Sequence, residues 1–404
     1  MKRKLLSIFM CVSMLSLVGC GNSQTAGSSV TTENTESITM EESGTEATRE
    51  AGETELVAEG SDVITVTDQN GMTVALPGDL DRVVTTALPL PSVYALTGAP
   101  IENLVGVHPG SASAIENSVM AAMYPELSGI ANNFIEGTDI NVEELLKLEP
   151  DVVLYWAEYL EQYKAMDNAG IRAVGVKTQA NGDVLTTLES WLEIMKEMFG
   201  DTGNVDKVID YGREMEAEIA EQTKNLTEEE KPKVLYLYNH SSEDISVSGA
   251  DFYGDYWIKA GGGVNAAAEL TGPTSVNMEQ IYEWNPDIIL ITTFTESMPQ
   301  DLYNNTIDGQ DWSQVNAVLN GKVYKEPLGV YRWFPPSGDA PLMLKWMAQT
   351  LHPEIFTYDM KNEIRDYYKE FYNYSLEEDQ IEGILTANPE AAKGANFGGS
   401  SGKS

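Results

Sequence analysis

Arg332 is the residue whose charge and neighbours best suit it to bind an anion. It stands between aromatic residues just before two prolines, and no other arginine occurs between Arg213 and Arg365. A guanidinium held in such a place can donate paired hydrogen bonds to a carboxylate or to the oxygens of a catecholate. A salt bridge to a nearby carboxylate such as Asp339 is the alternative role.

Aromatic residues recur just after the segments that are expected to be β-strands. In open α/β sheets, ligands bind beyond the carboxyl ends of the strands, and aromatic faces pack against planar ligands or chelates at little conformational cost. About half of such loop aromatics would instead be half-buried within their own lobe. The candidate ligand-binding residues at these strand ends are Leu88, Pro89, His108, Trp156, Tyr159, Tyr238, His240, Phe294, Tyr331, Arg332 and Trp333.

Direct metal binding and catalysis have weaker support. Zinc or manganese needs several imidazole and carboxylate ligands around one ion, and of the three histidines His352 stands at a predicted helix end. The other two, His108 and His240, are too few ligands for a direct zinc or manganese site. If His240 or Tyr238 ligated an iron ion, haem would be the better ligand. The sequence contains no phosphate-binding glycine loop, nucleophile elbow or metalloprotease motif. We therefore expect neither an enzyme nor a resident cofactor.

One sequence pattern occurs in each half of the chain. Residues 141–151 and 277–287 both begin with Asn, end with Pro-Asp and suit a short helix. Each is followed by a continuous apolar run, Val152–Trp156 or Ile288–Thr292, typical of parallel strands covered on both faces. Further strands are predicted at 82–86, 171–176, 233–238 and 322–324, and amphipathic helices at 184–198 and 205–226. We expect an α/β fold with two Rossmann-like lobes joined by a single long helix.

These segments together resemble the periplasmic binding proteins that serve ABC importers of ferric siderophores, haem and cobalamin. The resemblance covers residues 64–385 and rests on the order and spacing of its motifs. These motifs are Asp81–Val84, Gly98, Leu104–Val107, Asn141–Glu144, Pro150–Val153, Gly249, Gly261–Asn265, Asn285–Ile289 and Trp346–Phe356. The resemblance implies a helical linker, a ligand cleft between the two lobes and no catalysis.

The resemblance also implies an ABC permease dimer with its ATPase as the partner. In such proteins a surface glutamate on each lobe meets arginines of the permease. The matching positions, soon after the repeated strands, are Glu161 (or Glu158) and Glu296. The expected ligand is an iron–siderophore or a similar iron chelate, with haem, cobalamin or a bare Zn or Mn ion as alternatives. A surface adhesion or signalling module on the same scaffold is the alternative class of function.

The first twenty residues have the layout of a bacterial lipoprotein export signal. Three basic residues at positions 2–4 precede an apolar stretch, Leu5–Val18, that is too short to span a bilayer comfortably. The stretch runs into Cys20 through small residues, as in a lipobox, and cleavage there would also remove Cys11. A lone cysteine at the new N-terminus suits acyl attachment rather than a disulfide. An ordinary signal peptide with a chance cysteine is the alternative.

Composition suggests the remaining organisation. We expect a signal peptide at 1–19, the lipidated cysteine and a disordered acidic tether at 20–60, an N-terminal lobe at 61–200, a connecting helix at 201–231, a C-terminal lobe at 232–386 and a disordered tail at 387–404. The formal net charge is −38, and without a basic stripe to neutralise phosphates nucleic-acid binding is excluded. The mature protein is expected to be a monomer, held by its lipid on the extracellular or periplasmic face of the cell membrane.

Replacing Cys20 with serine should release the protein into the medium or leave it unprocessed, because the acylated thiol is the expected anchor. Cell fractionation with immunoblotting measures both outcomes. Normal cleavage together with full membrane retention of Cys20→Ser would contradict the lipoprotein prediction.

Overall fold

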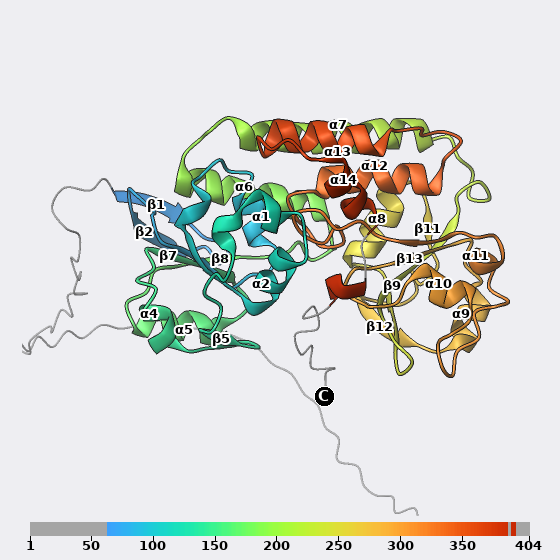
Figure 1. Ribbon diagram of the computed structural model, residues 1–404, viewed down its shortest axis with the longest axis horizontal. Helices are drawn as coiled ribbons and strands as arrows, with labels where there is room; N and C mark the ends of the chain where they lie inside the picture. The colour runs from blue at the N-terminus through green and yellow to red at the C-terminus, as the bar shows by residue number, and fades with distance from the viewer. Residues whose placement is uncertain (1–62, 387–388, 393–404) are drawn as a thin grey trace, which may run out of the picture. The chain divides into compact units, whose positions relative to one another are not determined.

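The structure is a computed structural model in which residues 63–386 and 389–392 are described. These residues form two α/β lobes (Figure 1), so the fold class predicted from the sequence is confirmed. Cys20, the predicted signal peptide and the predicted tether lie outside the described residues, as does most of the predicted tail. Within 63–386 and 389–392, no helix is both long and apolar enough to cross a membrane.

The N-terminal lobe is built on a parallel four-stranded sheet with the order β4-β3-β7-β8. The sheet strands are β3 (Val83–Thr85), β4 (Leu104–Val107), β7 (Val152–Trp156) and β8 (Ala173–Val176). An antiparallel ribbon of β1 (Val63–Thr67) and β2 (Thr73–Pro77) precedes it, and β5 (Ile135–Glu136) pairs with β6 (Asp139–Ile140). The helices of this lobe are α1 (Leu90–Tyr94), α2 (Pro109–Glu116), α3 (Met120–Met123), α4 (Val142–Leu146) and α5 (Leu160–Asn168).

The C-terminal lobe has a mixed sheet with the order β12-β10-β9-β13-β14, in which β11 also pairs with β9. Its strands are β9 (Lys233–His240), β10 (Ile245–Ser248), β11 (Val264–Asn265), β12 (Pro273–Val276), β13 (Ile288–Ile291) and β14 (Val323–Lys325). Its helices are α8 (Tyr253–Ala260), α9 (Met278–Trp284), α10 (Pro299–Tyr303) and α11 (Asn316–Leu319). The strands β9, β13 and β14 are parallel, so their carboxyl ends meet at one edge.

The repeated pattern forms the same local structure in both lobes. The side chains of Asn141 and Asn277 cap α4 and α9 by accepting hydrogen bonds from backbone amides three residues on. After each helix comes a left-handed residue, then proline, then an aspartate. Asp151 Oδ2 accepts from the backbone amide of Arg82 (2.9 Å), just before β3, and Asp287 Oδ2 accepts from that of Lys233 (3.0 Å), at the start of β9. Each aspartate thus fastens the neighbouring strand to its own.

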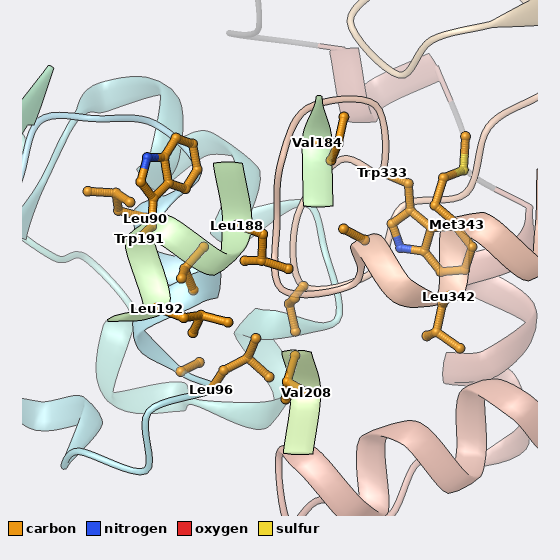
Figure 2. Packing of buried hydrophobic residues seen from close by; sticks show 14 of the residues in the cluster. Leu90, Leu96, Val184, Leu188, Trp191, Leu192, Val208, Trp333, Leu342 and Met343 are labelled. Carbon is orange, nitrogen blue, oxygen red and sulfur yellow. The ribbon is translucent and has the colours of Figure 1, made fainter. Parts of the chain in front are cut away.

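Helix α7 (Asn204–Thr223) follows α6 (Val184–Phe199) and runs across both lobes (Figure 1). The chain returns along α7 as α12 (Ala340–Leu351) and α13 (Met360–Phe371), and α14 (Glu378–Leu385) packs on α13. One continuous hydrophobic core includes residues of both sheets and of these helices. Figure 2 shows Trp191 of α6 and Val208 of α7 in the same core as Trp333 and Leu342, which belong to the returning chain. The shared core makes the connection stiff, because moving one lobe would expose apolar surface.

Candidate ligand-binding site

Five aromatic side chains gather at the carboxyl end of the C-terminal sheet. We call Tyr238, Phe252, Tyr253, Phe294 and Phe334 the aromatic cluster. The ring centroid of Tyr238 lies 5.2 Å from that of Phe252 and 5.6 Å from those of Phe294 and Phe334. The Tyr238–Phe252 pair is edge-to-face and the other two pairs are tilted. An edge-to-face pair at this distance contributes about 0.5–1.5 kcal/mol beyond the buried area. Phe334 is fully buried, whereas the other four rings are only half-buried and present an aromatic surface.

Arg332 lies directly behind this surface. Its side chain is 1% exposed, its guanidinium carbon is 5.1 Å from the ring centroid of Phe294, and Nη1 donates to the carbonyl of Thr293 at 2.8 Å. The amide and hydroxyl of Thr293 both donate to Glu326 Oε1 at 2.9 Å. Burial lowers the pKa of Arg332 and raises the pKa of Glu326. A positive charge is thus held in a low-dielectric setting one layer below the aromatic rings, where its field is poorly screened.

The N-terminal lobe supplies the opposite wall. A cavity of about 220 Å³ is lined by Trp156, Glu158, Tyr159 and Thr178, which follow the carboxyl ends of β7 and β8. The side chain of Thr178 lies beside that of Tyr253 in the C-terminal lobe. Burial is the main cause that raises the pKa of Tyr253, and the nearby charge of Glu158 adds to it. Tyr253 of the aromatic cluster therefore lies beside this cavity, next to Thr178.

The turn between β1 and β2 supports this wall from behind. Asn70 Nδ2 donates to the carbonyl of Ala157 at 3.0 Å, and Asp68 Oδ2 accepts from the amide of Gly175 at 3.2 Å. Asp68 is 4% exposed. Side chains of the first ribbon thus fix the two strand ends that carry Trp156 and Thr178.

Comparison with known proteins agrees with this two-lobed arrangement. Residues 93–327, more than half of the chain, match the family described as periplasmic binding protein. The chain belongs to this family. It is a substrate-binding protein of an ABC importer and not an enzyme.

Individual relatives are similar over most of the described chain. A periplasmic solute-binding protein from Veillonella parvula DSM 2008 is 32% identical, with a TM-score of 0.74 over 82% of this chain and 100% of that one. The molybdate-binding protein MolA of Haemophilus influenzae is 25% identical over 338 residues, which cover 78% of this chain and 92% of MolA. The uncharacterized ABC transporter substrate-binding lipoprotein YvrC of Bacillus subtilis is 27% identical over 228 residues, or 54% of this chain and 67% of YvrC.

The structure brings together part of the set of site residues predicted from the sequence. Trp156 and Tyr159 line the cavity, Tyr238 and Phe294 belong to the aromatic cluster, and Arg332 lies behind them. Tyr331 is buried beside Arg332, and the burial of its hydroxyl raises the pKa of Tyr331 to about 12.

Other predicted site residues of this binding protein do not line this cavity and have local structural roles. His108 caps α2 by accepting from the amide of Gly110 (3.0 Å), and Pro89 is the residue that precedes α1. The carbonyl of Leu88 accepts from the hydroxyl of Ser111 (2.8 Å).

His240 has its ring on the other side of the sheet from Tyr238. Its Nε2 lies 2.7 Å from Gln310 Oε1, and its ring packs against Trp312. A bulge between β9 and β10 separates the two residues in register. His240, Glu296 and Asp301 line a second cavity of about 500 Å³. In the described ranges, no group of three or more His, Cys, Asp or Glu residues could hold a metal ion.

Three residues at the candidate site were not predicted from the sequence: Phe252, Tyr253 and Thr178. Phe252 directly precedes α8 and Tyr253 is its first residue, and a search of strand ends does not lead to a helix start. Thr178 follows the predicted strand 171–176, yet it carries no aromatic or charged group that marks it.

Asp339 holds the loop that carries Arg332. Its Oδ2 accepts from the amide of Val330 (2.9 Å), the hydroxyl of Tyr368 (2.8 Å) and Trp333 Nε1 (3.1 Å), and Oδ1 accepts from the hydroxyl of Tyr372 (3.0 Å). The carboxylate therefore serves this network, rather than the ion pair with Arg332 considered from the sequence.

Asp339→Asn should change how the stability of the binding protein depends on pH. Burial raises the pKa of Asp339 to about 6, so the folded protein binds this proton more tightly than the unfolded chain. The resulting stabilisation is complete below about pH 4 and is lost as the pH rises through about 6, a difference of about 3 kcal/mol. Urea unfolding from about pH 4 to 8 should show the wild type losing stability relative to Asp339→Asn. A pH-independent difference between the two proteins would contradict this prediction.

Proposed function

We propose that this protein is a lipid-anchored receptor outside the cell that binds an iron–siderophore or a similar compact, anionic iron chelate and delivers it to the permease. The observation that carries the proposal is the half-exposed aromatic cluster with the buried charge of Arg332 behind it. Aromatic faces suit the flat organic part of a chelate, and the positive charge attracts its net negative charge. The lipobox-like segment before Cys20, and the similarity to a lipoprotein, support the anchor.

The size of the cavity favours a compact ligand. Its volume of about 220 Å³ lies below the range of roughly 300–1,000 Å³ that is common for ligand pockets. Haem or cobalamin would need the walls to part much further than a small chelate would. Direct binding of Zn or Mn has less support, since His108 and His240 are engaged in separate parts of the structure.

A bare oxyanion is the second candidate, and two observations favour it. The small cavity suits such an ion, and MolA, which is 25% identical to this chain, is named as molybdate-binding. An oxyanion would use the hydroxyl groups of Thr178 and Tyr253 and the field of Arg332, but it would leave the aromatic surface without a partner.

The test is titration of the purified full chain with ferric catecholate and hydroxamate complexes, haem, cobalamin, molybdate and free Zn²⁺ or Mn²⁺. Tryptophan fluorescence should respond, because Trp156 lines the cavity and packs against Trp191 at 5.6 Å. We expect saturable binding of a ferric chelate. Saturation by molybdate alone would establish the oxyanion instead, and binding of neither class would end both proposals.

Arg332→Ala should weaken binding of the anionic ligand by about 2 kcal/mol or more, because a desolvated negative charge would lose its counter-charge. Arg365→Ala is the matched control, since it removes the same charge from a half-buried site on α13, where Arg365 pairs with Glu378. Arg332→Lys keeps the charge but not the fork geometry. Equal affinities of the Arg332 and Arg365 variants, both shown to be folded, would remove Arg332 from the site.

We also propose that Glu161 and Glu296 meet the permease. Glu161 lies in the first turn of α5 beside Tyr159 and Leu160, whose side chains are 41% and 55% exposed. Glu296 is exposed on a loop that Lys325 holds, since Lys325 Nζ donates to the carbonyls of Thr295 (2.6 Å) and Ser297 (2.9 Å). Exposed charge on a rigid loop suits electrostatic docking.

The double substitution Glu161→Arg with Glu296→Arg should abolish uptake and leave ligand affinity unchanged, because like charges would then face the permease. Single substitutions should have small effects, since exposed ion pairs contribute little. The matched control is Glu143→Arg with Glu279→Arg, which places the same charges on the first turns of α4 and α9. Uptake assays in whole cells measure the difference, and normal uptake by the first double variant would move the docking surface elsewhere.

A further inference from the structure

The two lobes touch through their backbones at one edge of the ligand cavity. Gly182, in the loop between β8 and α6, is buried and has φ +72°. A Cβ atom at this position would lie 2.6 Å from the carbonyl carbon of Phe252 and 2.8 Å from its Cα. Cβ atoms do not approach other atoms so closely, so only glycine permits this contact. The main chains of the two lobes are therefore in direct contact here.

On the N-terminal side, hydrogen bonds hold the loop that carries Gly182. The amide of Gly182 donates to the carbonyl of Gln179 (3.0 Å), whose own amide donates to the hydroxyl of Thr187 in α6 (3.0 Å). That hydroxyl donates to the carbonyl of Asp183 (2.6 Å). Asp183 in turn caps α6 by accepting from the amide of Thr186 (2.8 Å). The loop is thereby tied to the first turn of a long helix.

On the C-terminal side, Phe252 is equally constrained. It is the residue before α8, and its carbonyl accepts from the amides of Asp255 (3.0 Å) and Tyr256 (3.2 Å). Its ring packs in the aromatic cluster, 5.4 Å from that of Phe334. Two helix starts thus meet with little freedom on either side, and the contact limits how closely the lobes can approach.

This contact adjoins both walls of the cavity. Thr178 precedes Gly182 in the same loop, and Tyr253 directly follows Phe252, so the residues that touch across the cavity flank the backbone contact. We infer that Gly182 is a positioning residue whose contact with Phe252 sets the separation of the two walls and thereby restricts the ligand to a compact size. The restriction on the ligand rests on the function proposed above, whereas the effect on wall separation does not.

Gly182→Ala tests the inference, with Gly170→Ala as the matched control. Gly170 has φ +73°, but a Cβ atom at this position would meet no other atom within 4 Å, so its substitution brings the same backbone strain without a clash. Spin labels are attached to cysteines that replace the exposed residues Glu143 and Glu279, one on each lobe. Pulsed electron paramagnetic resonance then measures the distance between the two labels. Cys11 and Cys20 are replaced by serine in all of these chains.

We expect a longer label-to-label distance in ligand-free Gly182→Ala than in the parent chain or in Gly170→Ala. We also expect about tenfold weaker binding of the compact ligand, with bulkier chelates losing less. Distances that are equal in both glycine variants would overturn the inference. The distance measurement needs no ligand, so it decides the role of Gly182 even if every ligand in the titration fails to bind.

Thr187→Val provides a second test if Gly182→Ala does not fold. It removes the hydroxyl that ties the loop to α6 and keeps the side-chain volume. The loosened loop should broaden the distribution of distances between the lobes without lengthening its mean. An unchanged width would show that this loop does not govern the separation of the walls, and would also overturn the inference.

Discussion

The candidate ligand-binding site depends on the hydrogen bonds that the buried carboxylate of Asp339 accepts. This carboxylate gathers donors from the loop before it, through Val330 and Trp333, and from α13 and its carboxyl end, through Tyr368 and Tyr372. A carboxylate without its donors would be very costly at this depth, so these segments are stable only together. Gly329 permits the approach, because a Cβ atom there would lie 1.8 Å from Asp339 Oδ2.

The position of Arg332 follows from this network. The loop that Asp339 holds places the guanidinium against Phe294 and the carbonyl of Thr293. Thr293 is in turn held by Glu326, which also accepts from the hydroxyl of Tyr236 (2.8 Å). Charge, aromatic surface and helix packing are therefore parts of one connected arrangement.

Much of the fold could be predicted because its strands are buried on both faces. Val152–Trp156 and Ile288–Ile291 are continuous apolar runs in the sequence, and both are strands within a residue of the predicted bounds. The antiparallel strands β1, β2 and β12 were not predicted, since they are largely exposed and carry alternating patterns over few residues. The buried strand β10 was not predicted either, because its two serines interrupt the apolar run. The helix predicted at 205–226 ends at Thr223, because propensity alone does not place a helix end.

The candidate site was harder to predict, since it depends on contacts between distant parts of the chain. The rule that ligand-binding residues follow strand ends correctly selected Trp156, Tyr238 and Phe294 as neighbours of the cavity or members of the aromatic cluster. The same rule also selected His108, which caps a helix. Whether a strand-end residue faces the cavity depends on local register, as the bulge that separates His240 from Tyr238 shows. Tyr253 reaches the site from a helix start, and only the packing of two lobes reveals it.

The ribbon of β1 and β2 has a mechanical consequence. β1 is the first described strand, and the turn at its end holds Ala157 and Gly175 behind the ligand wall through Asn70 and Asp68. Val63 pairs with Pro77, where the chain continues into the domain, so a pulling force applied at Val63 opens the five ladder pairs of this ribbon one after another from that end. Tension on the amino-terminal side of the domain therefore reaches the turn, and the strand ends that bear Trp156 and Thr178, only after these pairs have opened.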